Sequence, residues 1–144
     1  LGVRLSPFGQ YGGIHDTKPN ELFSFVINKL SEFQVAYLHL IEARGSEIGL
    51  ADDLHEGAVN NAVLFRSAFK GPLLSAGAYT PASATVAIEQ KHADAIVFGR
   101  LFIANPDLVE RIGANYPLNA FDRSTFYGGA EHGYTDYKKF GAAA

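Results

Sequence analysis

The chain has 144 residues, of which 47% are hydrophobic and 19% are charged, and its formal net charge is −3 at pH 7. This composition excludes a disordered chain, and the length suits one ordinary domain. The small negative charge argues against nucleic acid or an anionic membrane as a partner. No cysteine is present, which excludes disulfides and thiolate chemistry. No apolar run approaches the roughly 18 residues of a membrane span, so we expect a cytoplasmic protein.

The first third of the chain predicts two strands and one helix. An apolar run at 3–8 indicates a buried strand. Thr17 is suited to cap a helix that has Pro19 in its first turn. One face of this helix carries apolar residues at helical spacing, namely Leu22, Val26, Leu30 and Phe33. A second apolar run predicts a strand at 35–42, and a long loop is expected at 43–55.

The same alternation continues in the middle of the chain. Apolar residues at helical spacing predict a helix at 58–69, which ends at Gly71 before a strand at 73–76. Thr80, followed by proline, opens a third helix in cap-then-proline order. The last strand is expected at 94–98.

The last third of the chain contains one more expected helix. Asn105, followed by proline and aspartate, opens a short helix, and Gly113 is expected at its C-terminal end. A tail rich in glycine and aromatic residues occupies 115–144.

This alternation of short apolar strands with helices predicts an α/β fold with a parallel sheet and right-handed crossovers. Four such units are half of a (β/α)₈ TIM barrel, which typically needs ~250 residues. We therefore interpret 1–144 as one half-barrel domain. The missing half is expected in another chain or in a segment removed from this one, because a free four-strand sheet would have two apolar, unprotected edge strands. The absence of methionine and the start inside an apolar run also indicate a piece of a longer polypeptide. The alternative is a small open doubly wound sheet of four strands.

Two strand ends carry residues that suit an anion. Gly77 follows the third expected strand and Gly99 ends the fourth, and glycine lets backbone N–H groups approach an anion closely. Arg100 adds a cationic fork for a phosphate. The alternative is that both glycines only form tight turns and that Arg100 pairs with a surface carboxylate.

Few other residues in the pattern suggest chemistry. Arg4 lies in an apolar strand, so it either pairs with a carboxylate, with Glu42 the obvious candidate, or faces the electron-rich edge of a cofactor. His39 and Glu42 are three residues apart and should point to opposite faces of their strand, and His39 is expected to be a hydrogen-bonded core histidine. Asp52 and Asp53 are interpreted as a solvated turn. No histidine spacing indicates a metal site.

Aromatic residues in the tail leave two interpretations open. Phe126 and Tyr127 either cover a flat ligand or pack against the rest of the domain. For Tyr134 and Tyr137 we expect simple packing.

Three blocks of sequence carry a family resemblance. They are GVRLSPF at 2–8, GRLFIANPDL at 99–108, and DRSTFY at 122–127 continued by GYTDY at 133–137. In order and spacing they resemble the old yellow enzyme family of FMN-dependent ene-reductases, which includes the plant 12-oxophytodienoate reductases and the bacterial N-ethylmaleimide reductases. The resemblance covers nearly the whole chain and implies the C-terminal half, strands five to eight, of the family's barrel.

The resemblance also implies roles for seven residues. The six that it assigns to FMN are Arg4 at the pyrimidine edge of the flavin, Gly77, Ala78, Gly99 and Arg100 at the phosphate, and Phe126 beside the ring system. Tyr127 is placed on the substrate side. The sequence departs from the family pattern at Ala43, where proline is frequent, and at Ala78, where many members have glycine or asparagine.

The implied activity is transfer of a hydride from NAD(P)H through FMN to the activated C=C bond of an α,β-unsaturated carbonyl or a related small electrophile. In the family, the residues that hold the substrate oxygen and deliver the proton lie on the first half of the barrel. No residue of this chain is therefore expected to be catalytic. Two other readings remain open: a half-barrel that is inactive without its complementary half, and a phosphate-binding barrel aldolase or isomerase, which would need a buried base.

Overall fold

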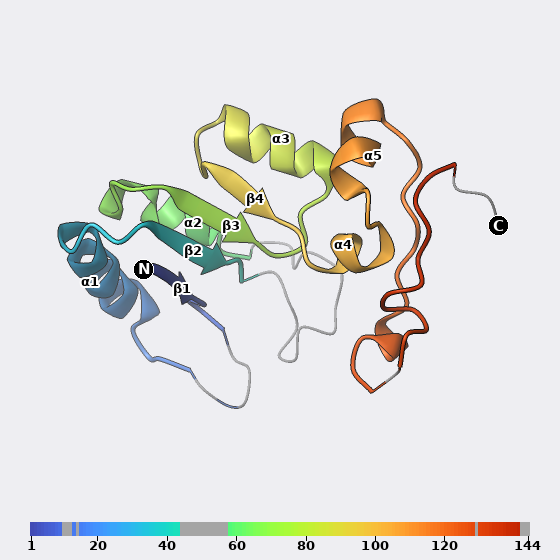
Figure 1. Ribbon diagram of the computed structural model, residues 1–144. Coiled ribbons are helices and arrows are strands. Elements are labelled where there is room, and N and C mark those ends of the chain that lie inside the picture. Colours follow the sequence, from blue (N-terminus) through green and yellow to red (C-terminus); the bar gives the residue numbers. More distant parts are fainter. Residues whose placement is uncertain (10–12, 14, 44–57, 129, 142–144) are drawn as a thin grey trace. The chain divides into compact units, whose positions relative to one another are not determined.

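The computed structural model describes residues 1–9, 13, 15–43, 58–128 and 130–141 (Figure 1). The chain divides into two compact units, Leu1–Val97 and Phe98–Ala144, and each is described by itself. Most of the expected loop at 43–55, including Asp52 and Asp53, lies outside the described residues.

The first unit contains a four-stranded parallel sheet. Its strands are β1 (Gly2–Leu5), β2 (Tyr37–Ile41), β3 (Leu73–Ala76) and β4 (Ala95–Val97). They lie in the order β1-β2-β3-β4, so each strand pairs with its neighbour in the sequence and β1 is at one edge. The predicted parallel α/β arrangement is confirmed.

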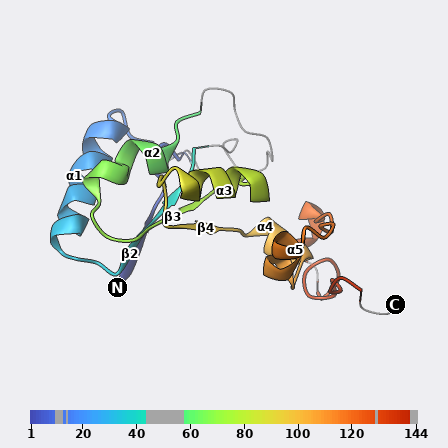
Figure 2. The same ribbon diagram turned by 90° about the horizontal axis from the view of Figure 1, so that it is seen from above.

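Helices connect these strands. They are α1 (Pro19–Glu32), α2 (Asn61–Phe65), which the 3₁₀ turn η2 (Arg66–Ala68) continues, and α3 (Pro81–Glu89). Figure 2 shows α1, α2 and α3 on the same side of the strands. A doubly wound sheet has helices on both faces. The one-sided arrangement with sequential strands is that of a barrel wall, and it excludes the doubly wound alternative.

The sheet has one apolar face and one mixed face because successive side chains point to opposite sides. Leu38, Leu40 and Leu73 are fully buried on the helix-covered face, where they pack with Ile27 and Phe65. Burying a leucine side chain contributes about 1.5–3 kcal/mol.

The opposite face of the sheet carries a different kind of residue. The strand register places Arg4 beside His39, and His39 beside Leu74. Since Leu38 and Leu40 on either side of His39 point into the core, His39 and its neighbours lie on the face away from the helices.

The first strand and the first helix differ in detail from the sequence predictions. The first strand ends at Leu5, because a turn follows in which Gly9 N–H bonds to the Ser6 carbonyl. Lys18, and not Thr17, is the N-cap of α1, and its side chain makes no capping hydrogen bond.

The buried face of α1 also differs from the expected one. Leu22 and Phe33 are 42% and 77% exposed, whereas Ile27 is fully buried and Phe23 and Leu30 pack against the core. The buried face of this helix is therefore rotated from the predicted one: it keeps Leu30 and adds Phe23 and Ile27, while Leu22 and Phe33 at the two ends of the predicted face are exposed.

Other predictions for the first unit are confirmed. The strand expected at 73–76 is β3. Thr80 caps α3 in a capping box, in which its hydroxyl accepts from Ser83 N–H at 3.1 Å and the Ser83 hydroxyl accepts from Thr80 N–H at 3.0 Å. Strong local signals of this kind do not depend on distant parts of the chain.

The second unit is built from short helices and an extended tail. Its helices are α4 (Arg100–Ala104), α5 (Leu108–Ala114) and the 3₁₀ turn η3 (Arg123–Thr125). The sequence did not predict α4, which is only five residues long and has no side-chain cap. Gly113 lies inside α5, contrary to expectation, and Asn115 ends the helix with a left-handed φ of 54°. Asparagine is the residue other than glycine that takes this position most readily.

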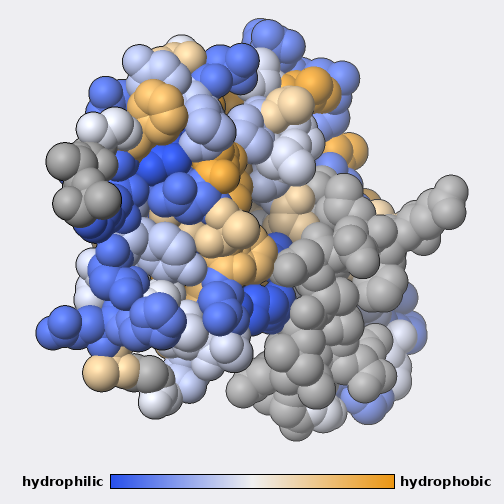
Figure 3. Space-filling model, turned by 90° about the vertical axis from the view of Figure 1, so that its right-hand side faces the viewer, coloured by the Kyte–Doolittle hydropathy of each residue, from blue (hydrophilic) through white to orange (hydrophobic). Residues whose placement is uncertain are grey.

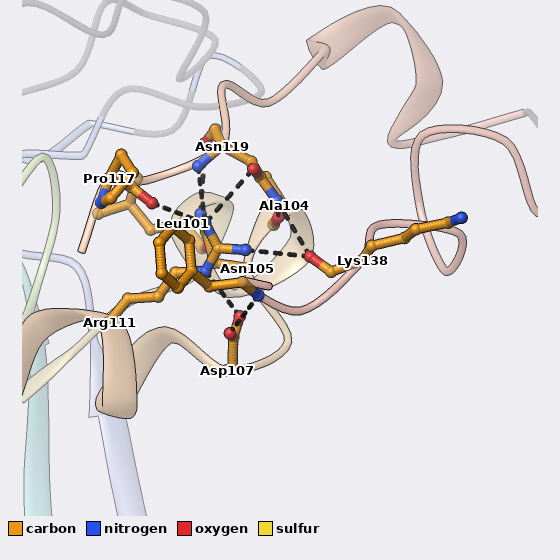
Figure 4. Close-up of polar contacts among 9 residues, drawn as sticks. Leu101, Ala104, Asn105, Asp107, Arg111, Pro117, Asn119 and Lys138 are labelled. Atoms are coloured by element: carbon orange, nitrogen blue, oxygen red, sulfur yellow. Dashed lines mark hydrogen bonds and ion pairs between the residues drawn. The ribbon is translucent and has the colours of Figure 1, made fainter. Parts of the chain in front are cut away.

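One buried arginine fixes the tail to α5 (Figure 4). Arg111 is 3% exposed, and its guanidinium donates to Asp107 Oδ1 at 2.7 Å and to the carbonyls of Pro117 at 2.6 Å and Lys138 at 3.0 Å. Asn119 N–H donates in turn to the Asn105 side chain at 2.7 Å. Polar contacts to the backbone thus hold the tail of this unit, which buries few apolar side chains, Ala104 and Leu108 among them.

The surface of the second unit retains large apolar side chains. Val109 and Tyr127 are 73% and 93% exposed, and Phe102, Tyr134 and Phe140 are each more than two fifths exposed. Figure 3 shows hydrophobic residues gathered among hydrophilic ones on one face of the molecule. No helix in the described part of the chain is long and apolar enough to cross a bilayer.

Candidate functional site

The end of β3 forms a strained backbone loop. Gly77 has a φ of 124° and Ala78 a φ of 49°. A Cβ atom on Gly77 would lie 3.1 Å from Glu42 Cβ and 3.3 Å from Glu42 N, so only glycine fits without a shift. Ala78 takes a left-handed conformation that costs a non-glycine residue about 1–2 kcal/mol. Glycine or asparagine would carry less strain at this position.

The N–H groups of this loop are available for a ligand. The backbone N–H groups of Gly77 and Ala78 donate no hydrogen bond to any other described residue, and neither does that of Gly99 in the second unit. Unpaired N–H groups at a turn with positive φ are the ordinary means by which a backbone binds an anion.

Glu42 lies behind the loop and is 4% exposed. Its carboxylate accepts from Asn61 N–H at 2.6 Å, from Ala62 N–H at 3.1 Å and from the Ser75 hydroxyl at 2.6 Å. These partners belong to the helix-covered side of the sheet, whereas Arg4 lies on the other side. The proposed Arg4–Glu42 ion pair is therefore wrong.

Arg4 and His39 form a polar pair on the face away from the helices. Arg4 is exposed, and His39 is half-buried. The Nε2 atom of His39 is buried and has no hydrogen-bond partner among the described residues, which contradicts the expected hydrogen-bonded core histidine. Burial lowers the pKa of the His39 imidazole, and the nearby charge of Arg4 lowers it further. His39 is thus neutral at pH 7.

In the second unit, Gly99 precedes α4 and Arg100 is its first residue. The Arg100 guanidinium lies 5.4 Å from the centroid of the Phe121 ring, at cation–π distance. Burial lowers the pKa of Arg100, and the charge of Arg123 lowers it further. An arginine side chain nevertheless stays protonated in proteins, so two positive charges lie close together here.

Aromatic side chains adjoin Arg100. The ring of Phe126 is half-buried and lies 5.8 Å from that of Phe121, and it meets Tyr127 edge-on at 6.3 Å. Tyr127 is 93% exposed, so it makes little packing contact within this unit. The second unit thus brings together Arg100, Phe126 and Tyr127 of the predicted residues. Sequence reasoning missed Phe121, for which the only signal was one more aromatic residue in an aromatic tail.

Tyr134 and Tyr137 were expected to pack. Tyr134 is 49% exposed, and Tyr137 is half-buried, with its hydroxyl accepting a hydrogen bond from Asp122 N–H at 3.2 Å. Tyr137 also lines a hollow of about 730 Å³ within the second unit, together with Arg111 and Asp136. Among the described residues, no group of three or more His, Cys, Asp or Glu side chains is arranged to hold a metal ion.

Comparison with known families gives a match over most of the chain. The model of a family described as NADH:flavin oxidoreductase / NADH oxidase matches residues 1–119. A curated relative, the 12-oxophytodienoate reductase-like protein of Solanum lycopersicum, is 41% identical over 139 residues, which are 95% of this chain. The chain spans only 35% of that relative's length.

Solved structures give the same result. Morphinone reductase is 39% identical with a TM-score of 0.82, over 96% of this chain and 36% of that protein. The old yellow enzyme from Trypanosoma cruzi is 32% identical with a TM-score of 0.84, over 96% of this chain and 35% of that protein. These neighbours are TIM barrels, and their partial coverage confirms that the four-stranded sheet is part of a barrel wall.

Proposed function

Because this chain belongs to the NADH:flavin oxidoreductase / NADH oxidase family, we propose that it is the FMN-binding part of an NAD(P)H-dependent ene-reductase. Its substrates are α,β-unsaturated carbonyls or related small electrophiles with an activated C=C bond. The names of the relatives support this, and morphinone reductase has been solved with tetrahydroNAD, an analogue of the reductant. When bound, the flavin supplies the hydride-transfer chemistry, and the protein binds and orients it.

The observation that carries the proposal is the phosphate-type loop after β3, found in a chain that matches this family. Gly77 and Ala78 offer two backbone N–H groups that make no hydrogen bond to a described residue. Gly99 offers a third, and Arg100 offers a guanidinium. Backbone donors and a cationic fork are what a phosphate group requires, so these residues fit FMN. We assign the FMN phosphate to these four residues.

Arg4 is assigned to the pyrimidine edge of the flavin. Its side chain is exposed on the sheet face that the helices leave uncovered, and no hydrogen bond or ion pair joins it to another described residue. A fixed cation at this edge stabilises negative charge that reduction places on the ring system.

The remaining contacts come from aromatic side chains. Phe126 is assigned to the side of the flavin, and the exposed Tyr127 to the wall of the substrate site. We assign no catalytic acid or base to this chain. The groups that hold the substrate oxygen and deliver a proton are proposed to belong to the other half of the barrel, carried by another chain or another segment.

A visible absorption spectrum of the purified protein tests this function. For the chain alone we expect the bands of oxidised flavin and release of FMN on denaturation. When the other half of the barrel is also present, we expect bleaching by NADPH or NADH under anaerobic conditions and recovery of the bands when 2-cyclohexenone is added. A protein that stays colourless after incubation with FMN would overturn the proposal.

A further inference from the structure

Glu42 makes hydrogen bonds to three of the five residues from Ser75 to Tyr79, the segment that contains the loop of Gly77 and Ala78. Its Oε1 atom accepts from the Ser75 hydroxyl at 2.6 Å and from the Tyr79 hydroxyl at 3.4 Å, one at each end of the segment. The two hydroxyl groups also lie 3.0 Å apart.

The backbone of Glu42 holds the middle of the same segment. Its N–H donates to the Ala76 carbonyl at 2.7 Å. Its Cβ and N atoms limit the space beside Gly77, where any side chain would come within 3.1 Å. Glu42 thus bonds to the segment before and after Gly77 and leaves no room for a side chain at Gly77 itself.

The burial of the Glu42 carboxylate is compensated by hydrogen bonds. Glu42 is 4% exposed, and no described cation pairs with it. Desolvating a carboxylate is unfavourable unless hydrogen bonds replace the lost water. Here hydrogen bonds from Asn61 N–H, Ala62 N–H and the Ser75 hydroxyl replace that water. The carboxylate keeps all three bonds only while α2 and β3 hold their positions relative to each other.

We propose that Glu42 is a positioning residue that fixes the Gly77–Ala78 loop in its phosphate-binding conformation. This inference rests on the proposed FMN function. Alanine disfavours the φ of 49° that Ala78 adopts, so residues outside the loop must hold the loop in this conformation. The contacts of Glu42 with Ser75 and Tyr79, on either side of the loop, impose it.

The charge of Glu42 makes the inference testable, because loss of the charge and loss of the positioning contacts would change FMN affinity in opposite directions. A negative charge behind the loop repels a phosphate, so removing it would strengthen binding if charge alone mattered. Glu42→Gln removes the charge and replaces one acceptor oxygen by an NH₂ group, which cannot accept a hydrogen bond from the backbone N–H groups of α2. If Glu42 positions the loop, this variant binds FMN more weakly.

The experiment measures the dissociation constants of FMN and of riboflavin, which lacks the phosphate, for the purified apoprotein. We expect Glu42→Gln to weaken FMN binding by about tenfold while riboflavin binding stays within about twofold. A stability role alone would lower the melting temperature and leave the FMN-to-riboflavin affinity ratio unchanged, and a charge effect alone would raise the ratio. Either result would overturn the inference.

Two further variants complete the design. Glu32→Gln changes an exposed glutamate of α1 and should leave both affinities unchanged. If Glu42→Gln does not fold, Ser75→Ala removes one of the two loop contacts and should lower the affinity ratio by about threefold. An unchanged ratio in Ser75→Ala would then overturn the inference. A parent protein that binds FMN no more tightly than riboflavin would overturn the phosphate assignment itself and this inference with it.

Discussion

The two units of the chain are stabilised in different ways. The first has a core of aliphatic and aromatic residues between a sheet and its helices, with Leu40 and Leu73 fully buried. The second depends on polar contacts, in which Arg111 links α5 to the carbonyls of Pro117 and Lys138. Apolar burial is non-directional and tolerates small changes, whereas a buried guanidinium depends on the position of every acceptor. The second unit should therefore be more sensitive to a single polar substitution.

Arg111→Ala should have the largest effect on stability. It removes the guanidinium donor from Asp107 and from two backbone carbonyls in a site where the arginine was 3% exposed. Breaking a buried pair on one side costs about 3–5 kcal/mol. We expect the tail to detach, with rapid proteolysis within 115–141 before the first unit unfolds. Lys29→Ala, which removes an exposed ion pair of α1, is the matched control and should be nearly neutral. Equal protease resistance of parent and Arg111→Ala would contradict the comparison.

Leu40→Ala is the corresponding test of the first unit. Leu40 is fully buried in the sheet core, and truncating such a side chain costs about 2.5–4 kcal/mol. The loss should appear as a lower urea midpoint for the first unit, without selective release of the tail. Val86→Ala in α3, where the side chain is 48% exposed, should cost less than about 1 kcal/mol. If both valine and leucine truncations cost the same, the sheet core described above would not be the main source of stability.

The same contrast explains which structural features could be predicted from the sequence. β3 and the helix cap at Thr80 were predicted because apolar runs and caps are local signals. The end of α5 at Asn115 was missed, since glycine is the more frequent residue there and Gly113 stood two residues earlier. The anchoring role of Arg111 has no local signal, because its partner Lys138 is 27 residues away.

The candidate site shows a similar division. Gly77, Ala78, Gly99 and Arg100 were named from glycine positions and a family resemblance, and their roles remain proposals. The network of Glu42 was not predicted, because it joins residues 19 to 37 positions apart that the fold brings together behind the loop. The alternative in which Arg4 pairs with Glu42 fails for the same reason: sequence spacing alone does not show which partners each sheet face offers.

Arg100→Ala tests the site in the second unit. If Arg100 binds the FMN phosphate, its loss removes a charge-assisted contact worth about 2 kcal/mol, which corresponds to about thirtyfold weaker FMN binding. Riboflavin binding should stay unchanged, because riboflavin has no phosphate. Lys18→Ala, which removes an exposed cation of the first unit, controls for net charge. An unchanged FMN dissociation constant on equilibrium dialysis would rule out the assignment.

The first unit also contains a polar link, which is formed by the Asp94 side chain. Replacing Asp94 should have the smallest effect on stability. Its carboxylate accepts from Leu73 N–H at 2.7 Å and from the Arg66 guanidinium at 2.7 Å. The bond from Leu73 N–H lowers the pKa of Asp94 below its ordinary value of 3.8, and the Arg66 side chain lowers it further. A depressed carboxyl pKa means that the folded state binds the proton more weakly than the unfolded state does. The stabilisation is therefore complete above pH 3.8 and is lost as the pH falls through the lower, folded-state value.

The lowered pKa of Asp94 predicts how the urea midpoints of the parent and of Asp94→Asn differ with pH. At about pH 7 the variant should unfold at a lower urea concentration than the parent, because only the parent has the charged acceptor. At acid pH, below 3.8, the parent loses that advantage as Asp94 is protonated at its lowered folded-state pKa, and the two midpoints should approach each other. Asp94 is 58% exposed at its side chain, so solvent screens the pair and the difference should be small at every pH. Gln90→Ala, a neutral change at the exposed end of α3, should shift the midpoint equally at both pH values. A constant difference between Asp94→Asn and the parent across this range would show that the link acts through shape and not through charge.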